Sequence, residues 1–502
     1  MSGRTAGWIA AAAFLVYALT GGGRIVGSDE VAMLELSRAM LHGRIDVAQG
    51  ATLQGPGGRH YTKNAAGQAV LALPLVAVAE AAGRASGPPP ERRVLAVRLI
   101  VSFFNAAVTA VLLGVFYGTA RGLGIGTRAA LEATLLLGFT TPLWVYAKSF
   151  MAEPLQALGL LLVLGGAVRS CGGERRGAIQ AAIGVLLAVS VKLSMLPLAV
   201  LCLFPIPRQP LAFWRWPSFG LLVALAGHLA FNAARFGTPF ETGYGAQATP
   251  SAYTTPLWVG LYGLLLSSGK GVLWFAPALM LAPVGWRAMR RAGGPARHAA
   301  TSVALASGAA LALYATFEHW AGDGSFGPRY LVPLLPLAFL AVALALERVS
   351  VVSRRVAWAL GLIGLAVQIG GVAIHFGAQM REAGDYPYAL PLNDPRFMSD
   401  SHFNPRFSPI AGHWRMLGRN VEEHLRGAAP RLGGGGTVDP RVGVSAEDQE
   451  RLLHALDFWW LYARYAGVPA APVTAALLVL LVAAAAAAVR LRRAVAREAR
   501  AP

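Results

Sequence analysis

Apolar runs of 15 to 24 residues recur along the whole chain, and short Arg-rich or Gly/Pro-rich connections separate them. A helix needs about 20 apolar residues to cross the hydrocarbon core of a bilayer. Since 55% of the residues are hydrophobic and only 14% are charged, we predict an all-α polytopic membrane protein. The net charge of +19 does not indicate a nucleic-acid partner, because the arginines gather in the short connections, where the orientation of membrane helices requires positive charge.

The runs predict about twelve transmembrane helices with both termini on the cytoplasmic side. The predicted spans lie at about 6–20, 94–120, 129–147, 153–168, 178–191, 193–206, 213–234, 271–286, 299–317, 330–346, 356–376 and 468–489. The segments that this topology places inside carry twenty arginines but only three acidic residues, as the positive-inside rule requires. An apolar helix at 67–82 is placed at the outer interface, because a crossing there would put the Arg-rich connections outside.

This topology divides the chain into three parts. The predicted parts are a transmembrane module at 1–376, an outer segment at 377–467, and a last span with a basic cytoplasmic tail at 468–502. The first outer loop of the module, at 21–93, contains two juxtamembrane helices at 28–42 and 67–82. High Arg, Ala and Gly usage indicates a GC-rich bacterium, so we expect the inner (plasma) membrane, with the outer face periplasmic or extracellular.

Two acidic sites lie on the predicted outer side. Asp29 and Glu30 stand in the first turn of the first juxtamembrane helix, and Glu153 precedes Pro154 at the start of a predicted span. Helix capping alone would explain acids at these positions. Transfer of a group away from a phosphate leaving group also requires acids beside cations. A carboxylate takes the proton of the attacking hydroxyl, while cations, or a metal bound by the acids, stabilise the phosphate.

The chain has only four lysines, and all of them fall on the predicted outer side, against the usual placement of positive charge. They are Lys63, Lys148, Lys192 and Lys270. Arg329, at the outer start of a span, adds a planar guanidinium suited to phosphate. Each lysine could instead extend to lipid headgroups. Together the five cations predict a site for a lipid phosphate.

Several of these stretches have counterparts in a known family. They are Ser28 to Leu41, similar to a first-loop Asp-Glu motif with its juxtamembrane helix; Tyr61 to Gly67, similar to a Lys-Pro-Pro stretch; Lys148 to Leu155, similar to a second-loop acidic site; and 231–244, 267–271 and 320–331, similar to uncharacterised bacterial members. The chain thereby resembles the GT-C superfamily of lipid-linked-sugar glycosyltransferases, which includes protein O-mannosyltransferases and lipid A aminoarabinose transferases. It departs from the pattern at Ala65 and Ala66, which replace paired prolines, and at Glu153, where some members have Asp.

The resemblance implies a GT-C fold and an inverting transfer of a sugar at the outer face of the membrane. The implied donor is linked to a polyprenyl phosphate such as undecaprenyl phosphate, and the acceptor is a hydroxyl of a glycan, lipid or protein. Asp29 would be the general base or a metal ligand, Glu30 and Glu153 further catalytic acids, and the five cations the donor site. Asp29 and Glu153 are candidate ligands of a divalent cation, Mg or Mn. Candidate contacts to sugar or acceptor are Asn232, Tyr244 and Trp320.

Two alternatives remain open. The first is a flippase or transporter of polyprenyl-linked sugars, which would keep charged groups near the middle of the membrane. Here the charges avoid the centres of the predicted spans, so an enzyme is favoured. The second is a glycan ligase or polymerase with a lipid diphosphate donor, which nothing in the sequence separates from a monophosphate-dependent transferase.

Overall fold

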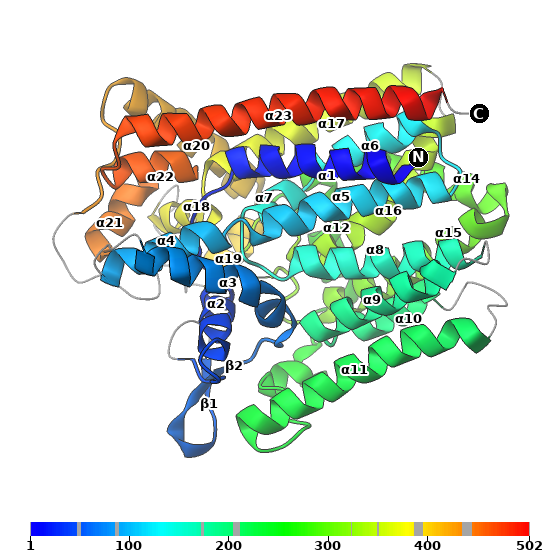
Figure 1. The fold of residues 1–502 in the computed structure, drawn as a ribbon, viewed down its shortest axis with the longest axis horizontal. Coiled ribbons are helices and arrows are strands. Elements are labelled where there is room, and N and C mark those ends of the chain that lie inside the picture. Colours follow the sequence, from blue (N-terminus) through cyan, green and yellow to red (C-terminus); the bar gives the residue numbers. More distant parts are fainter. Residues whose placement is uncertain are drawn as a thin grey trace.

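The computed structural model describes residues 2–47, 52–85, 90–171, 175–203, 211–322, 324–348, 351–385, 395–433 and 444–500, and almost all of its regular structure is helical (Figure 1). The helices of the first half are α1 (Ser2–Leu19), α2 (Ser28–Met40), α3 (Gly67–Ala85), α4 (Pro90–Val101), α5 (Phe104–Gly122), α6 (Thr127–Phe139), α7 (Leu143–Ala147), α8 (Glu153–Ser170), α9 (Arg175–Val191), α10 (Met195–Leu203) and α11 (Leu211–Phe236). Those of the second half are α12 (Leu257–Leu266), α13 (Val272–Phe275), α14 (Ala282–Ala292), α15 (Gly294–Thr316), α16 (Leu335–Arg348), α17 (Val351–Ala373), α18 (Phe376–Asp385), α19 (Pro395–Phe403), α20 (Pro409–Leu425), α21 (Ala446–Arg451), α22 (Trp459–Tyr465) and α23 (Ala470–Ala499).

Short elements complete the fold. Strands β1 (Thr52–Gln54) and β2 (His60–Thr62) form an antiparallel hairpin with Leu53 opposite Tyr61. The 3-10 turns are η1 (Pro56–Gly58), η2 (Gly245–Ala248), η3 (Pro250–Ala252), η4 (Pro277–Leu281), η5 (Arg329–Leu334), η6 (Pro405–Phe407) and η7 (Leu452–His454).

The long helices run side by side along the longest axis of the molecule (Figure 1). Small residues let α8 and α9 approach closely. A Cβ added to Gly166 would lie 2.5 Å from the backbone nitrogen of Ala181, and one added to Gly184 would lie 2.5 Å from that of Val163. Helices in lipid gain little from the hydrophobic effect against one another, so such close backbone packing supplies much of their attraction.

Of the helices in the described residues, seven are long and apolar enough to cross a membrane. They are Gly67–Ala85, Arg93–Gly122, Leu211–Phe236, Gly294–Thr316, Arg329–Arg348, Arg354–Ala373 and Ala470–Ala499. This agrees with a polytopic helical membrane protein, whereas the count of twelve stays a prediction. The structure also adds α12, an apolar helix outside the predicted spans.

Two predicted spans are broken by proline. The run at 129–147 becomes α6 and α7, since Pro142 interrupts the helix and the hydroxyl of Thr141 donates back to the Leu137 carbonyl. The run at 271–286 becomes α13, η4 and α14, with Pro277 at the break. Both prolines are present in the sequence, but a prediction from hydropathy alone takes no account of the break that proline causes in a helix.

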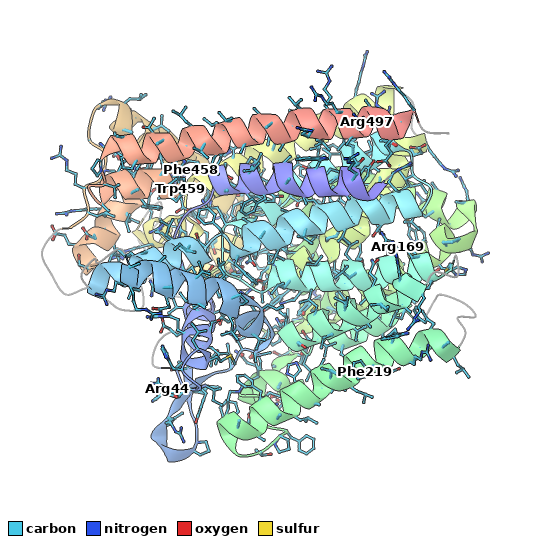
Figure 2. The ribbon with its side chains drawn as sticks, viewed as in Figure 1. Arg44, Arg169, Phe219, Phe458, Trp459 and Arg497 are labelled. Atoms are coloured by element: carbon cyan, nitrogen blue, oxygen red, sulfur yellow. The ribbon has the colours of Figure 1, made fainter. Side chains whose placement is uncertain are left out.

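The two ends of the bundle differ. The N-terminal end of α1 and the C-terminal end of α23 lie together at one end, while α2, α3, the β-hairpin and α18–α22 lie at the other (Figure 1). Figure 2 shows Arg169 and Arg497 near the end with the termini, and Phe458 and Trp459 at the opposite end. Arg169 and Arg497 therefore lie at the end that the topology prediction places inside.

The segment after α17 is tied closely to the start of the chain. The Trp459 backbone N–H donates to the Gly21 carbonyl at 2.8 Å, and the Trp459 indole N–H donates to the Ala18 carbonyl at 2.8 Å. The Trp460 indole N–H donates to the Leu19 carbonyl at 3.1 Å. These bonds fix the loop that leads from α1 into α2.

Candidate functional site

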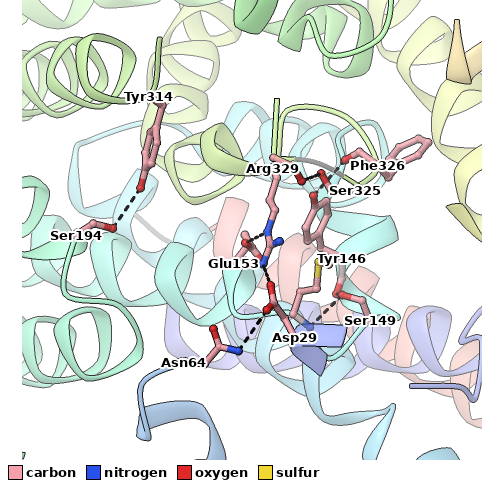
Figure 3. Close-up of polar contacts among 12 residues, drawn as sticks. Asp29, Asn64, Tyr146, Ser149, Glu153, Ser194, Tyr314, Ser325, Phe326 and Arg329 are labelled. Carbon is pink, nitrogen blue, oxygen red and sulfur yellow. Dashed lines mark hydrogen bonds and ion pairs between the residues drawn. The ribbon is translucent and has the colours of Figure 1, made fainter. Parts of the chain in front are cut away.

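An arginine joins the two predicted acidic sites (Figure 3). Arg329 Nε lies 2.6 Å from Glu153 Oε1, and its Nη2 lies 3.1 Å from Asp29 Oδ2. Asn64 Nδ2 contacts the other oxygen of Asp29 at 3.5 Å. Residues from three distant parts of the chain thus form one charged cluster, in which the carboxylate of Glu153 is 2% exposed and that of Asp29 20%.

Each member of this cluster stands at the end of a helix. Asp29 lies in the first turn of α2 and Glu153 opens α8, where Pro154 suits the first helical turn. Arg329 opens η5 after a tight turn, in which Gly327 has φ +64°. A Cβ on Gly327 would also lie 2.9 Å from Phe275, so glycine serves both the backbone conformation and the packing.

The pKa of Asp29 is set by opposing effects. Burial would raise the pKa of its carboxyl, but the charges of Arg329 and Lys63, with the Asn64 hydrogen bond, lower it below the ordinary value. Asp29 is therefore ionised at neutral pH, as a general base must be before it accepts a proton. While it is paired with Arg329, its basicity is held down.

Glu30 has a different place from the one expected of a catalytic acid. Its carboxylate is buried and accepts hydrogen bonds from the Gly27 and Phe150 backbone N–H groups. It therefore ties the start of α2 to the loop before α8, which carries Glu153. Burial raises the pKa of Glu30, although these hydrogen bonds partly offset the rise. The prediction that Glu30 is catalytic is not supported by these contacts, which make it a structural link.

Two of the four lysines flank the cluster through aromatic rings. Lys63 Nζ lies 5.5 Å from the centre of the Tyr244 ring, and Lys192 Nζ lies 5.1 Å from that of Tyr330, the neighbour of Arg329. Burial raises the pKa of Tyr244, and the charges of Lys192, Asp29 and Arg329 also act on its hydroxyl. Tyr244, a predicted sugar or acceptor contact, thus belongs to the same site as the cations.

A clamp that the sequence did not reveal holds the loop bearing Lys63 and Asn64. Arg235, at the end of α11, is 2% exposed and donates to the Thr62 and Asn64 carbonyls. Asn232 Oδ1 accepts from Arg235 Nη2 at 2.7 Å. Asn232 was predicted to contact sugar or acceptor, but its amide instead orients Arg235 and donates to the Pro239 carbonyl. The one available signal was an arginine at the end of an apolar run.

Lys148 is engaged away from the Arg329 cluster. Its Nζ lies 2.7 Å from Asp457 Oδ2 and also donates to the Val372 and Asp457 carbonyls. Arg24 pairs with the same carboxylate at 3.3 Å. Burial would raise the pKa of Asp457, but Lys148 and Arg24 lower it below its usual range. The predicted phosphate ligand is therefore a buried structural cation that binds the segment after α17 to the bundle.

Two further predicted residues lie outside the cluster. Lys270 Nζ donates to the Ser325 carbonyl at 2.7 Å and is 3% exposed. Trp320 is buried and packs against the rings of His402 and Phe403, with centroids 5.6 and 5.4 Å away. The ammonium of Lys270 is bound to the loop before η5, and Trp320 packs against α19. A direct role of either residue in binding donor or acceptor stays a prediction.

The donor set does not favour a metal ion. Among the residues that the structure describes, no three His, Cys, Asp or Glu side chains converge on one point. The two predicted ligands, Asp29 and Glu153, both bind the guanidinium of Arg329, which occupies the place of a shared cation. A divalent ion at this site stays a prediction.

Comparisons with known proteins give structural neighbours only. No family model and no curated protein sequence matches the chain. Its structure is similar to that of ArnT from Cupriavidus metallidurans in the apo state, with TM-score 0.49 and 18% identity over 91% of this chain and 75% of that one. The same ArnT bound to undecaprenyl phosphate gives a TM-score of 0.47 and 17% identity, over 92% of this chain and 77% of that one. The Archaeoglobus fulgidus oligosaccharyltransferase in the apo form gives a TM-score of 0.41 and 12% identity, over 89% of this chain and 63% of that one.

These neighbours are GT-C proteins. They belong to the superfamily that the sequence motifs resemble. With TM-scores below 0.5, the likeness does not itself assign an activity to this chain, and what the chain does must be argued from its own residues.

Proposed function

We propose that the chain is a membrane glycosyltransferase that moves a sugar from a polyprenyl-phosphate-linked donor to an acceptor hydroxyl, with inversion at the anomeric carbon. The observation that carries the proposal is the Arg329 guanidinium between Asp29 and Glu153, with Lys63 and Lys192 beside it. The donor class follows from the motif resemblance, and undecaprenyl phosphate, the ligand in one ArnT structure, belongs to that class.

In the proposed reaction Asp29 takes the proton from the acceptor hydroxyl. The acceptor oxygen then forms a bond to the anomeric carbon while the bond from that carbon to the phosphate oxygen breaks. The electron pair stays on the phosphate. Lys63, Lys192 and Arg329 stabilise this charge in a partly buried site, where a fixed cation acts more strongly than in water.

Glu153 would position Arg329 rather than react. Its carboxylate is almost fully buried and lies 2.6 Å from Arg329 Nε, so it fixes the plane of the guanidinium. Donor phosphate and Asp29 would then compete for the remaining side of Arg329. Binding of the phosphate would release Asp29 from its ion pair and raise its basicity at the step where a base is needed.

The test is transfer of label from a panel of radiolabelled polyprenyl-phosphate sugars by the full-length protein in lipid nanodiscs that contain envelope lipids and glycans. We expect at least one donor to give a labelled product with an inverted anomeric configuration, and a parallel assay with a chelator tests the predicted divalent ion. Donor movement across sealed vesicles without any transfer would support the flippase alternative and reject the proposal.

A further inference from the structure

Helix α20 has three faces of different character. Residues three or four positions apart lie on the same side of a helix, so its 17 residues can be sorted by side. The first face is buried against the protein and contains His413, Met416 and Asn420. Asn420 Nδ2 donates to the Leu453 and Ala455 carbonyls, each at 3.0 Å. These bonds fix the rotation of α20 about its axis, and therefore fix which residues point away from the protein.

The second face of α20 is apolar and exposed. Trp414, Val421 and Leu425 follow one another at i, i+7 and i+11, which places them on one side of the helix. Their side chains are 43%, 38% and 84% exposed. Gly418 lies between them, and a Cβ added there would meet nothing within 4 Å. We call this surface the α20 stripe. An exposed apolar surface of this kind marks a contact with another apolar surface.

The third face of α20 is charged. It contains Arg415, Glu422 and Arg426, all of them exposed, and the last two form an ion pair one turn apart. The α20 stripe therefore lies between the face that packs on the protein and a face that carries full charges. A helix in the plane of a membrane interface has this arrangement, because its apolar side enters the lipid while its charged side stays in water.

The position of α20 along α17 agrees with a membrane interface. Arg354–Ala373, within α17, is one of the apolar segments long enough to cross a membrane. The Trp414 indole N–H donates to the Ala366 carbonyl at 3.1 Å, seven residues before the end of α17. At 1.5 Å per residue, this carbonyl lies about 10 Å inside the end of the span. The apolar face of an interfacial helix reaches a similar depth, about 5–10 Å.

The exposed apolar surface of α17 continues into the α20 stripe. Leu362, Ile363 and Ile369 are exposed and lie three or four residues from Ala366, to which Trp414 is bound. Exposed apolar side chains on a membrane-crossing helix face acyl chains. Because the two surfaces adjoin, the lipid that covers α17 also reaches the start of the α20 stripe.

Further tryptophans lie at the same end of the bundle. Helix α22 begins with Trp459, whose indole is bound to the last turn of α1, and it lies beside α20 in Figure 1. The two helices are joined where His424 Nε2 lies 2.6 Å from the Tyr465 hydroxyl. Tryptophan gathers where a membrane meets water, so this level of the bundle has the composition of an interface.

We propose that α20 lies in the membrane leaflet next to the candidate site, with Trp414, Val421 and Leu425 in contact with acyl chains. The partner of the α20 stripe is the lipid bilayer and not a second protein, because the stripe continues the lipid-facing surface of α17. The segment after α17 is then seated on the membrane as well as bound through Asp457 to Lys148. This inference does not depend on the proposed function.

The test measures whether lipid or water reaches the α20 stripe. Cys171→Ser removes the exposed native thiol, and a bimane label is then attached at Val421→Cys or Leu425→Cys, with Glu422→Cys on the charged face as the matched control. The full-length protein is placed in nanodiscs of phosphatidylcholine with a nitroxide on the acyl chain, and iodide serves as the quencher in water. We expect the nitroxide lipid to quench the two stripe labels at least about twofold more than the control label, and iodide to show the reverse order.

Three results would overturn the inference. If iodide quenches the stripe labels as strongly as the Glu422→Cys label, the stripe faces water. If neither quencher reaches the stripe labels, a second copy or another protein covers the stripe. Charges of both signs flank the stripe, so the contact should not require anionic lipid. Quenching by lipid that appears only after phosphatidylglycerol is added would show that charge, and not apolar contact, holds α20. All three labelled positions are exposed, so the substitutions should leave the fold intact.

Discussion

The structure and the sequence assign Lys148 different tasks, and the substitution Lys148→Met separates them. Methionine keeps the length of the side chain but removes the ammonium group that donates to Asp457 Oδ2 and to the Val372 and Asp457 carbonyls. Asp457 would keep its contacts with Arg24 at 3.3 Å and with the Tyr462 hydroxyl at 2.8 Å. Breaking a buried ion pair costs about 3–5 kcal/mol. Because Arg24 remains, we expect the lower end, about 3 kcal/mol of unfolding free energy.

The assay is reversible unfolding of the full-length protein in mixed micelles at rising fractions of a denaturing detergent, beside Lys192→Met as the control. Lys192 is half-buried over the Tyr330 ring, so its loss should change the unfolding free energy by less than about 1 kcal/mol. Its loss should instead raise the KM for donor about tenfold or more, since hydrogen bonds to charged groups are worth about 1.5–3 kcal/mol. The reasoning is refuted if Lys148→Met is as stable as the wild type and binds donor as poorly as Lys192→Met does.

Three other predictions follow from the site. Arg235→Lys should raise the KM for donor about tenfold with little change in kcat, because an ammonium cannot bridge the Thr62 and Asn64 carbonyls in the planar geometry of arginine. Steady-state kinetics measures KM and kcat, and an equal fall in kcat would contradict this prediction. Glu30→Gln should lower the unfolding free energy by about 1–3 kcal/mol, as one buried N–H loses its acceptor, while the rate per folded molecule falls less than tenfold; a loss near that of a catalytic acid would show that Glu30 reacts. The pKa of Asp29 is lowered in the free protein, so kcat/KM should fall only as the pH drops below the ordinary carboxyl value of 3.8. In the donor complex the bound phosphate draws Arg329 away from Asp29, so the acid limb of the kcat profile should lie at higher pH. If the acid limbs of the two profiles coincide, phosphate and Asp29 do not compete for Arg329.

Helix positions and the outer acidic sites could be predicted because their causes are local. Hydropathy marks apolar helices, and an acid before Pro154 or in the first turn of α2 has a reason that neighbouring residues supply. The structure brings Asp29, Glu153 and Arg329 together, and all three were predicted site residues. They were predicted because each lies at the outer end of a predicted helix. That position does not show which of them contact one another.

The rest depends on contacts between distant residues. The sequence placed Lys148 at the outer end of a predicted span but could not show that Asp457, 309 residues later, would pair with it. For the same reason Arg235 was missed, since its partner Thr62 lies 173 residues earlier. The burial of an outer cation and the residue that it pairs with decide whether it is available to a ligand. Hydropathy encodes neither of them.

The central claim is that Asp29 acts as the base in sugar transfer, and Asp29→Asn tests it most directly. Asparagine keeps the shape of the side chain but cannot take the proton, so the account predicts that transfer from the active donor falls about 10²–10⁴-fold while the unfolding transition stays close to that of the wild type. Asp46→Asn is the matched control, because Asp46 lies in the same loop and pairs only with the exposed Arg44 among the described residues; its rate should not change. Transfer by Asp29→Asn at the rate of Asp46→Asn would show that Asp29 merely caps α2, and would contradict the account.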